Sequence, residues 1–286
     1  MTTRATRIAT VSLIAALIPS ALIAPAHGHV DPALQQHVDA NERHAPAGES
    51  ATLTAGHADI GPTITDDGGA RTMSLKVRDD HAQPPVWREL SDVTVNVPDH
   101  AAITLPDDRA YDFTGGEAGK PVWVLPQTEA TDVPWLGWNT QHPGLIESGA
   151  QGVTLSLTQV EGPGQFSLFL QNGGFEAPQV LWNSAENLPQ DLWVDMNTHT
   201  HANWVFSAPG TYELTVTATA TGADGTEYSA TAPLRFEVGS EQARAEYTPA
   251  SSTTWLYIVA AAVIIAVLVG AAVAVRRRRS AGGERA

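Results

Sequence analysis

Two histidines occupy alternate positions near the end of the chain, in the stretch N-T-H-T-H-A-N-W at 197–204. In an extended segment, residues two apart project from the same face, about 6.5–7 Å apart, so His199 and His201 share one face. Two imidazoles on one face can bind one cation if a neighbouring element supplies a third ligand. Imidazole suits Zn, Cu, Fe or Ni, and added carboxylates or carbonyls favour Mn. The pair is equally compatible with histidines that only hydrogen-bond to loop carbonyls, and this alternative stays open.

The elements that would position these histidines are predicted by a period-two alternation of apolar and polar residues. The clearest segment is 212–220, and the alternation resumes at 228–238 after the turn signal Asp224-Gly225. Shorter segments of the same kind lie at 73–77, 93–97 and 153–157. Such alternation indicates strands with one packed and one solvated face. Many short strands between Pro and Gly turns predict an all-β fold, an antiparallel β-sandwich of immunoglobulin-like or jelly-roll-like type.

Both ends of the chain carry targeting patterns. Residues 1–26 have a basic start, an apolar stretch and the cleavage pattern Ala24-Pro25-Ala26, which predicts a signal peptide. Residues 255–275 carry no charge and are long enough to span a bilayer as a transmembrane helix, and the basic tail 276–286 follows. We therefore expect a single-pass protein of the cell membrane, with its N-terminal domain extracellular and its C-terminus cytoplasmic.

Between these ends, composition predicts three parts: a flexible His-containing arm at 27–54, the β-sandwich at 55–239, and a polar stalk at 240–254. The chain has no cysteine, which excludes thiolate metal sites and disulfides. Residues 27–254 carry 9 basic and 30 acidic side chains, a net charge of −21. This charge repels nucleic acid and attracts cations, although it would also serve simply to keep an exposed domain soluble.

Several stretches along the chain, taken together, match the motifs of one known domain family. The H-x-H stretch extends to T-H-T-H-A-N-W-V-F-S-A-P-G-T-Y, and further matches follow in order along the chain. They are A-G-H-A-D-I-G-P at 55–62, P-P-V-W-R-E-L at 84–90, P-V-W-V-L-P-Q-T at 121–128, W-L-G-W-N-T-Q at 135–141 and A-P-Q-V-L-W at 177–182. In these stretches the chain resembles the choice-of-anchor M domain of surface proteins from high-GC Gram-positive bacteria. The resemblance implies a β-sandwich surface domain, often encoded beside ABC transporters of the metal-uptake type.

The resemblance also adds residues to the candidate site. The family's G-H-V-D pattern falls on Gly56, His57, Ala58 and Asp59, with alanine in place of the usual valine. Because the first and last strands of a sandwich often neighbour each other, we predict a site for Zn or Mn formed by His57, Asp59, His199 and His201. Where relatives have histidine in V-H-D-D, this chain has Arg78, so position 78 is left out of the site.

A second cation site is predicted at the processed N-terminus. Cleavage after Ala26 would leave His27-Gly28-His29 at the start of the mature chain. A free α-amine, two backbone amides and His29 supply four nitrogens in a plane, an arrangement that suits Cu(II) or Ni(II). The site depends on cleavage at that position.

The remaining features do not indicate an enzyme. No nucleophile elbow or other catalytic motif is present. The tryptophans at 135–138 could line a ligand groove, although large aromatics more often fill sandwich cores. We predict a surface protein that binds a divalent metal and is associated with a metal-type ABC transporter. The alternative is a structural or adhesive module that meets cell-wall components or other surface proteins.

Overall fold

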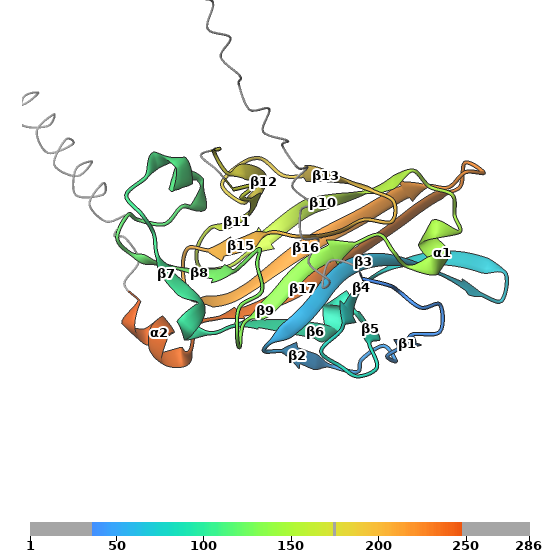
Figure 1. Ribbon diagram of the computed structural model, residues 1–286, viewed down its shortest axis with the longest axis horizontal. Helices are drawn as coiled ribbons and strands as arrows, with labels where there is room; N and C mark the ends of the chain where they lie inside the picture. Colours follow the sequence, from blue (N-terminus) through green and yellow to red (C-terminus); the bar gives the residue numbers. More distant parts are fainter. Residues whose placement is uncertain (1–35, 174–175, 248–286) are drawn as a thin grey trace, which may run out of the picture. The chain divides into compact units, whose positions relative to one another are not determined.

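The computed structural model describes residues 36–173 and 176–247, and these form three β-sheets (Figure 1). Sheet A has the order β1 (Arg43–His44), β5 (Val86–Glu89), β4 (Ala70–Asp79), β3 (Gly56–Asp67), β9 (Pro134–Asn139), β14 (His199–His201). Sheet B has the order β13 (Gln190–Asp195), β10 (Gly152–Glu161), β16 (Gly210–Thr221), β17 (Glu227–Val238), β6 (Val93–Val97), β2 (Ala51–Leu53). Sheet C has the order β12 (Gln179–Asn183), β11 (Phe166–Leu170), β15 (Asn203–Phe206), β8 (Pro121–Leu125), β7 (Ala102–Thr104). Short helices lie between the strands or, for α2, after the last strand: η2 (Leu90–Asp92), η3 (Asp99–Ala101), η4 (Arg109–Thr114), α1 (Pro143–Ile146) and α2 (Glu241–Glu246).

The hairpin of β16 and β17 lies at the centre of sheet B and follows the predicted alternation. Tyr212 pairs with Phe236 in register, and both side chains are fully buried, whereas their polar neighbours along the strands face outward. The hydroxyl of Tyr212 donates to the carbonyl of Ala208 at 2.8 Å, which satisfies its polar end inside the core. Gly225 turns the chain between the two strands with φ of +84°, a conformation that glycine adopts without strain.

Sheets A and B pack against each other over a continuous apolar core, in which β4 contacts β17 (Figure 1). This arrangement confirms the predicted all-β sandwich. The expectation of purely antiparallel pairing is wrong, because four pairs are parallel: β1 with β5, β3 with β9, β2 with β6, and β6 with β17. Alternation along a strand shows which face is buried but contains no information on the direction of its partner.

The segments next to the sandwich are more ordered than the composition predicts. Residues 36–54 are not a flexible arm, because β1 joins the edge of sheet A and β2 the edge of sheet B. The predicted stalk begins instead with helix α2, capped by Ser240, and Tyr247 packs on Trp123 with ring centroids 6.3 Å apart. Composition did not reveal this packing because it depends on partners far away in the sequence.

Candidate metal centre

The four predicted ligands lie on two strands of sheet A, β3 and β14, which flank β9. Strand β9 separates β3 from β14, and its residue Gly137 is in register with Asp59 on one side and His201 on the other. Because side chains alternate along a strand, His57 shares the face of Asp59, and His199 shares the face of His201. The opposite face carries core residues such as Ile60 and Leu136. The four side chains therefore gather on the outer face of sheet A, away from the core.

Gly137 makes this gathering possible. A β-carbon at this position would lie 2.5 Å from the Thr200 carbonyl oxygen, 2.6 Å from Oδ1 of Asp59 and 2.9 Å from Cε1 of His201. Any side chain on the central strand would therefore occupy the space in which the ligands meet. The stretch W-L-G-W, considered from sequence as a groove, instead forms the strand on which the cluster lies.

The ligand atoms converge on one point. The Nε2 atoms of His57, His199 and His201 lie 2.9, 3.0 and 3.1 Å from one another. Oδ1 of Asp59 lies 3.1 Å from Nε2 of His199 and 3.7 Å from Nε2 of His201, and Oδ2 lies 3.7 Å from Nε2 of His57. Four atoms bonded tetrahedrally to zinc at 2.0–2.1 Å would be about 3.3–3.4 Å apart. The observed separations bracket this value.

Hydrogen bonds cannot account for all of these close contacts at once. Each Nε2 has one in-plane position, which holds either a proton or a lone pair, so one proton can bridge only one pair of nitrogens. The third nitrogen can donate to Oδ1 of Asp59, but the remaining close nitrogen–nitrogen contacts then lack a hydrogen bond. A cation at the common point is the simplest species that satisfies all three nitrogens and the carboxylate together.

Burial and charge favour the metal-binding protonation state at Asp59 and His201, and the protonated state at His57. Burial alone would raise the pKa of Asp59, but the hydrogen bond to His199 and the nearby histidine charges lower it to about 2. Burial lowers the pKa of His201 to about 3. Burial would also lower the pKa of His57, yet its bond to Asp80 and the charges of Asp59 and Asp80 raise it. At neutral pH, Asp59 is therefore ionised and His201 neutral, as metal ligation requires.

An aromatic neighbour, Trp135, and a carboxylate neighbour, Asp80, orient two of the three histidine rings. Trp135 stacks on His201 with ring centroids 4.0 Å apart and an interplanar angle of 18°. Nδ1 of His57 lies 2.9 Å from Oδ2 of Asp80 and donates to it when Nε2 is the metal-binding nitrogen. The Nδ1 atoms of His199 and His201 are buried and have no partner among the described residues. Of the three histidines, His57 is thus the one oriented by a carboxylate.

Sequence reasoning missed the residues that support the ligands. Arg78 is not a ligand, but its guanidinium pairs with Asp80, the residue that orients His57. Asn139 donates from Nδ2 to Oδ2 of Asp59 at 3.3 Å. The resemblance to V-H-D-D drew attention to positions 78–80, but nothing in the sequence showed that Asp80 would face His57.

The other sequence candidates are placed as follows. His27 and His29, the predicted copper or nickel site, lie outside the described residues. Trp135 and Trp138 are 4% and 5% exposed, which leaves no open aromatic groove along that stretch. The tryptophan that does reach solvent among the described residues is Trp193, which is 57% exposed on β13.

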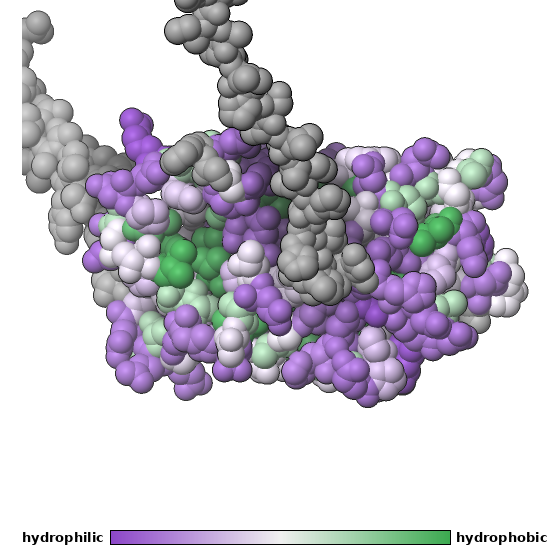
Figure 2. Space-filling model, viewed as in Figure 1, coloured by the Kyte–Doolittle hydropathy of each residue, from purple (hydrophilic) through white to green (hydrophobic). Residues whose placement is uncertain are grey.

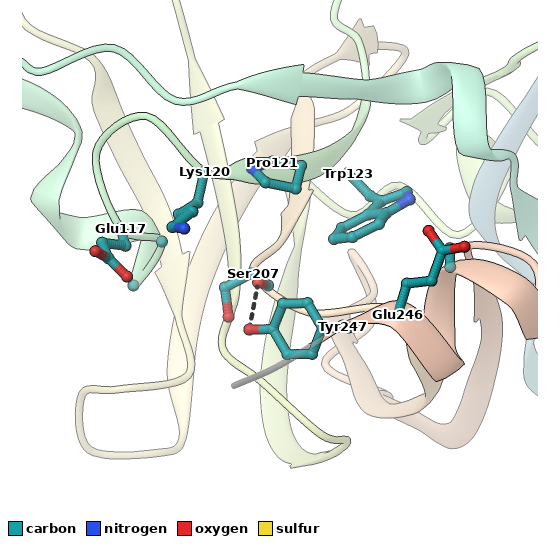
Figure 3. A pocket seen from close by; sticks show the side chains of 10 residues that line it. Glu117, Lys120, Pro121, Trp123, Ser207, Glu246 and Tyr247 are labelled. Atoms are coloured by element: carbon teal, nitrogen blue, oxygen red, sulfur yellow. Dashed lines mark hydrogen bonds between the residues drawn. The ribbon is translucent and has the colours of Figure 1, made fainter. Parts of the chain in front are cut away.

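The larger hollows of the surface lie away from the cluster. A cavity of about 690 Å³ lies beside helix α2, with Trp123, Tyr247 and Lys120 in its wall (Figure 3). A second, of about 440 Å³, lies over sheet C, where apolar residues from β7, β8 and β15 reach the surface (Figure 2). Neither cavity includes a residue of the histidine cluster. The four candidate ligand atoms themselves all lie within 4.8 Å of one another, close enough to hold a single metal ion.

No family model and no curated protein matches this chain. The choice-of-anchor M resemblance thus stays a hypothesis drawn from the quoted stretches. Within residues 36–173 and 176–247, no helix is both long enough and apolar enough to cross a bilayer. The predicted signal peptide at 1–26 and the predicted span at 255–275 lie outside the described residues.

Proposed function

We propose that this protein binds a divalent transition metal ion through His57, Asp59, His199 and His201. One observation carries the proposal: three imidazole Nε2 atoms within 3.1 Å of one another, beside a buried carboxylate. A buried carboxylate is costly unless a positive charge accompanies it, and a divalent ion supplies that charge. The strongly acidic composition of the chain further attracts cations to its surface.

Zinc is the ion that the donor set favours. Three imidazole nitrogens and one carboxylate oxygen make a complete tetrahedral set for Zn²⁺. Manganese prefers oxygen ligands and a larger coordination number, which these four donors alone do not provide. Three of the four ligand side chains are also nearly inaccessible, with exposed fractions of 2% for His199 and His201 and 0% for Asp59. We therefore place zinc first and manganese second.

The same geometry supports binding rather than catalysis. Catalytic zinc sites keep a coordination position open for water or substrate, whereas four protein ligands fill the tetrahedral shell. We accordingly propose a non-enzymatic protein, in which the ion is either cargo or a structural support.

We further propose that the protein works at the outer surface of the cell membrane and supplies metal to an ABC transporter. The support is the signal pattern at 1–26, the apolar stretch at 255–275 and the resemblance to choice-of-anchor M domains. The alternative is a structural or adhesive module, which meets cell-wall components or surface proteins and uses the histidines for internal contacts alone.

Metal analysis of the full-length chain tests the proposal. We expect close to one equivalent of zinc per chain, detected by elemental analysis and by titration with zinc, manganese and copper. The variant His199→Ala/His201→Ala should lose this ion. The matched variant His27→Ala/His29→Ala, which removes two histidines elsewhere, should retain it. Absence of zinc from the unmodified chain would favour the structural alternative, and loss of metal in the second variant alone would move the site to the N-terminus.

A further inference from the structure

The outer face of sheet A is covered by the segment that precedes β1. Glu42 accepts two hydrogen bonds from Arg78, at 2.7 Å from Nε and 2.6 Å from Nη2, and a third from the indole of Trp87 at 2.9 Å. Val38 in the same segment is buried, with 7% of its surface exposed. We call residues 36–42 the strap.

The strap is joined to a metal ligand through a short chain of polar contacts. Gln36 donates from Nε2 to Oδ2 of Asp80 at 3.0 Å, the same oxygen that faces Nδ1 of His57 at 2.9 Å. The other carboxylate oxygen of Asp80 pairs with Arg78, whose guanidinium is also held by Glu42. Asp80 is therefore fixed from two sides by groups that the strap provides or orients.

The strap also lies at the accessible side of the cluster. The side chain of His57 is 17% exposed and that of Asp80 is 20% exposed, whereas the other three ligands are at most 2% exposed. In this structure the cluster therefore reaches solvent on the His57 side. Gln36 is on that side because it shares Asp80 with His57.

We propose that the strap controls release of the bound ion by holding Asp80 against His57. This inference rests on the proposed metal site and concerns its regulation. A bidentate Arg–carboxylate pair fixes the orientation of both groups, so the Glu42–Arg78 pair anchors the strap and positions the guanidinium for Asp80. Carboxylates that orient a metal-bound histidine strengthen ligation, and their loss weakens metal binding about 10- to 100-fold. Displacement of the strap would thus open the exit and loosen His57 in one step.

Two substitutions with the same change of charge test the strap. Glu42→Gln removes the charged anchor at Arg78. Glu49→Gln is the control, because Glu49 pairs with Arg43 and Arg88 at the surface and does not reach Asp80. We expect zinc to transfer to a chromophoric chelator at least about tenfold faster from Glu42→Gln than from the unmodified chain. Glu49→Gln should release zinc at the unmodified rate.

Two further measurements separate the strap from a general loss of stability. The visible spectrum of the Co²⁺-loaded protein reports ligand geometry, and we expect it to change in Glu42→Gln but not in Glu49→Gln. Gln36→Ala, which removes one donor to Asp80, should accelerate release less than Glu42→Gln. Equal release rates in the folded Glu42→Gln and Glu49→Gln proteins would overturn the proposed role of the strap in ion release. An unmodified chain that binds neither zinc nor cobalt would instead overturn the metal site itself.

Discussion

The β16–β17 hairpin and the outer face of sheet A bury their residues for different reasons. The hairpin buries apolar side chains such as Tyr212, Leu214 and Phe236 and exposes the polar residues between them. The outer face of sheet A instead buries Asp59, Lys76, Arg78, Asn139 and His201. Apolar burial stabilises the fold with no further requirement, whereas each buried polar or charged group needs a specific partner.

This difference separates the residues that stabilise the fold from the residues that we propose bind the ion. Removing a partner on the outer face should change ion binding more than folding, and removing a core side chain should do the opposite. Four predictions test that separation, and they are ordered by the expected change in free energy.

Phe236→Ala should cause the largest loss of stability. Phe236 is completely buried and packs on Trp204 and Phe206, with ring centroids 5.8 and 4.9 Å away. Truncation of a buried phenylalanine costs about 3–5 kcal/mol. Urea unfolding should show this loss equally with and without zinc, and the folded variant should bind zinc normally. Thr231→Ala on the exposed side of the hairpin should change stability by less than about 0.5 kcal/mol.

His142→Gln should remove part of the sensitivity to acid. Burial beside His44 and Trp87 lowers the pKa of His142 to about 4 from its ordinary 6.5. Between pH 6.5 and pH 4, His142 is protonated in the unfolded chain but not in the folded protein. The free energy of unfolding is therefore highest above pH 6.5 and decreases as the pH falls toward 4. The loss amounts to about 3 kcal/mol.

Unfolding measured at pH 7 and pH 4.5 checks the His142 prediction. The drop in stability between the two values should be smaller for His142→Gln than for the control His100→Gln, which alters an exposed histidine. Identical drops in both variants would show that the imidazole of His142 is protonated as readily in the folded protein as in the unfolded chain.

Zinc should stabilise the folded protein by binding on the outer face of sheet A and at no other site. An ion at 100 times its dissociation constant raises the free energy of unfolding by about 2.7 kcal/mol if only the folded chain binds it. The unmodified protein and Phe236→Ala should both show this gain in thermal unfolding, whereas His199→Ala/His201→Ala should not. A gain in the double variant would place the ion at a different site.

Gly137→Ala and Gly225→Ala compare one glycine in each region. Gly137 has no room for a β-carbon, and we expect the overpacked variant to lose about 1–3 kcal/mol and to bind zinc at least about tenfold more weakly. Gly225 has open space but a positive φ, so its replacement should cost about 1 kcal/mol and leave zinc affinity unchanged. Zinc titration of both variants checks the contrast, and normal affinity in Gly137→Ala would show that the ligands do not converge over β9.

The sequence by itself determined the strands and their buried faces. Alternation at 212–220 and 228–238 predicts the central hairpin, because a strand exposes every second residue to the same environment. The spacing of His199 and His201 places them on one face for the same reason. His57 and Asp59 entered through the resemblance, and they occupy one face of β3. All of these are local properties, which neighbouring residues are sufficient to define.

Only the tertiary structure decided how these residues meet. The proximity of the first and last strands was expected to join His57 to the histidine pair, but β9 lies between them and Gly137 leaves the space they share. Asp80, Arg78 and Glu42 acquire their roles through contacts between strands and the strap that no periodicity encodes. Alternation specifies the face of a residue, whereas its partner depends on which strands pair, in which direction and in which register.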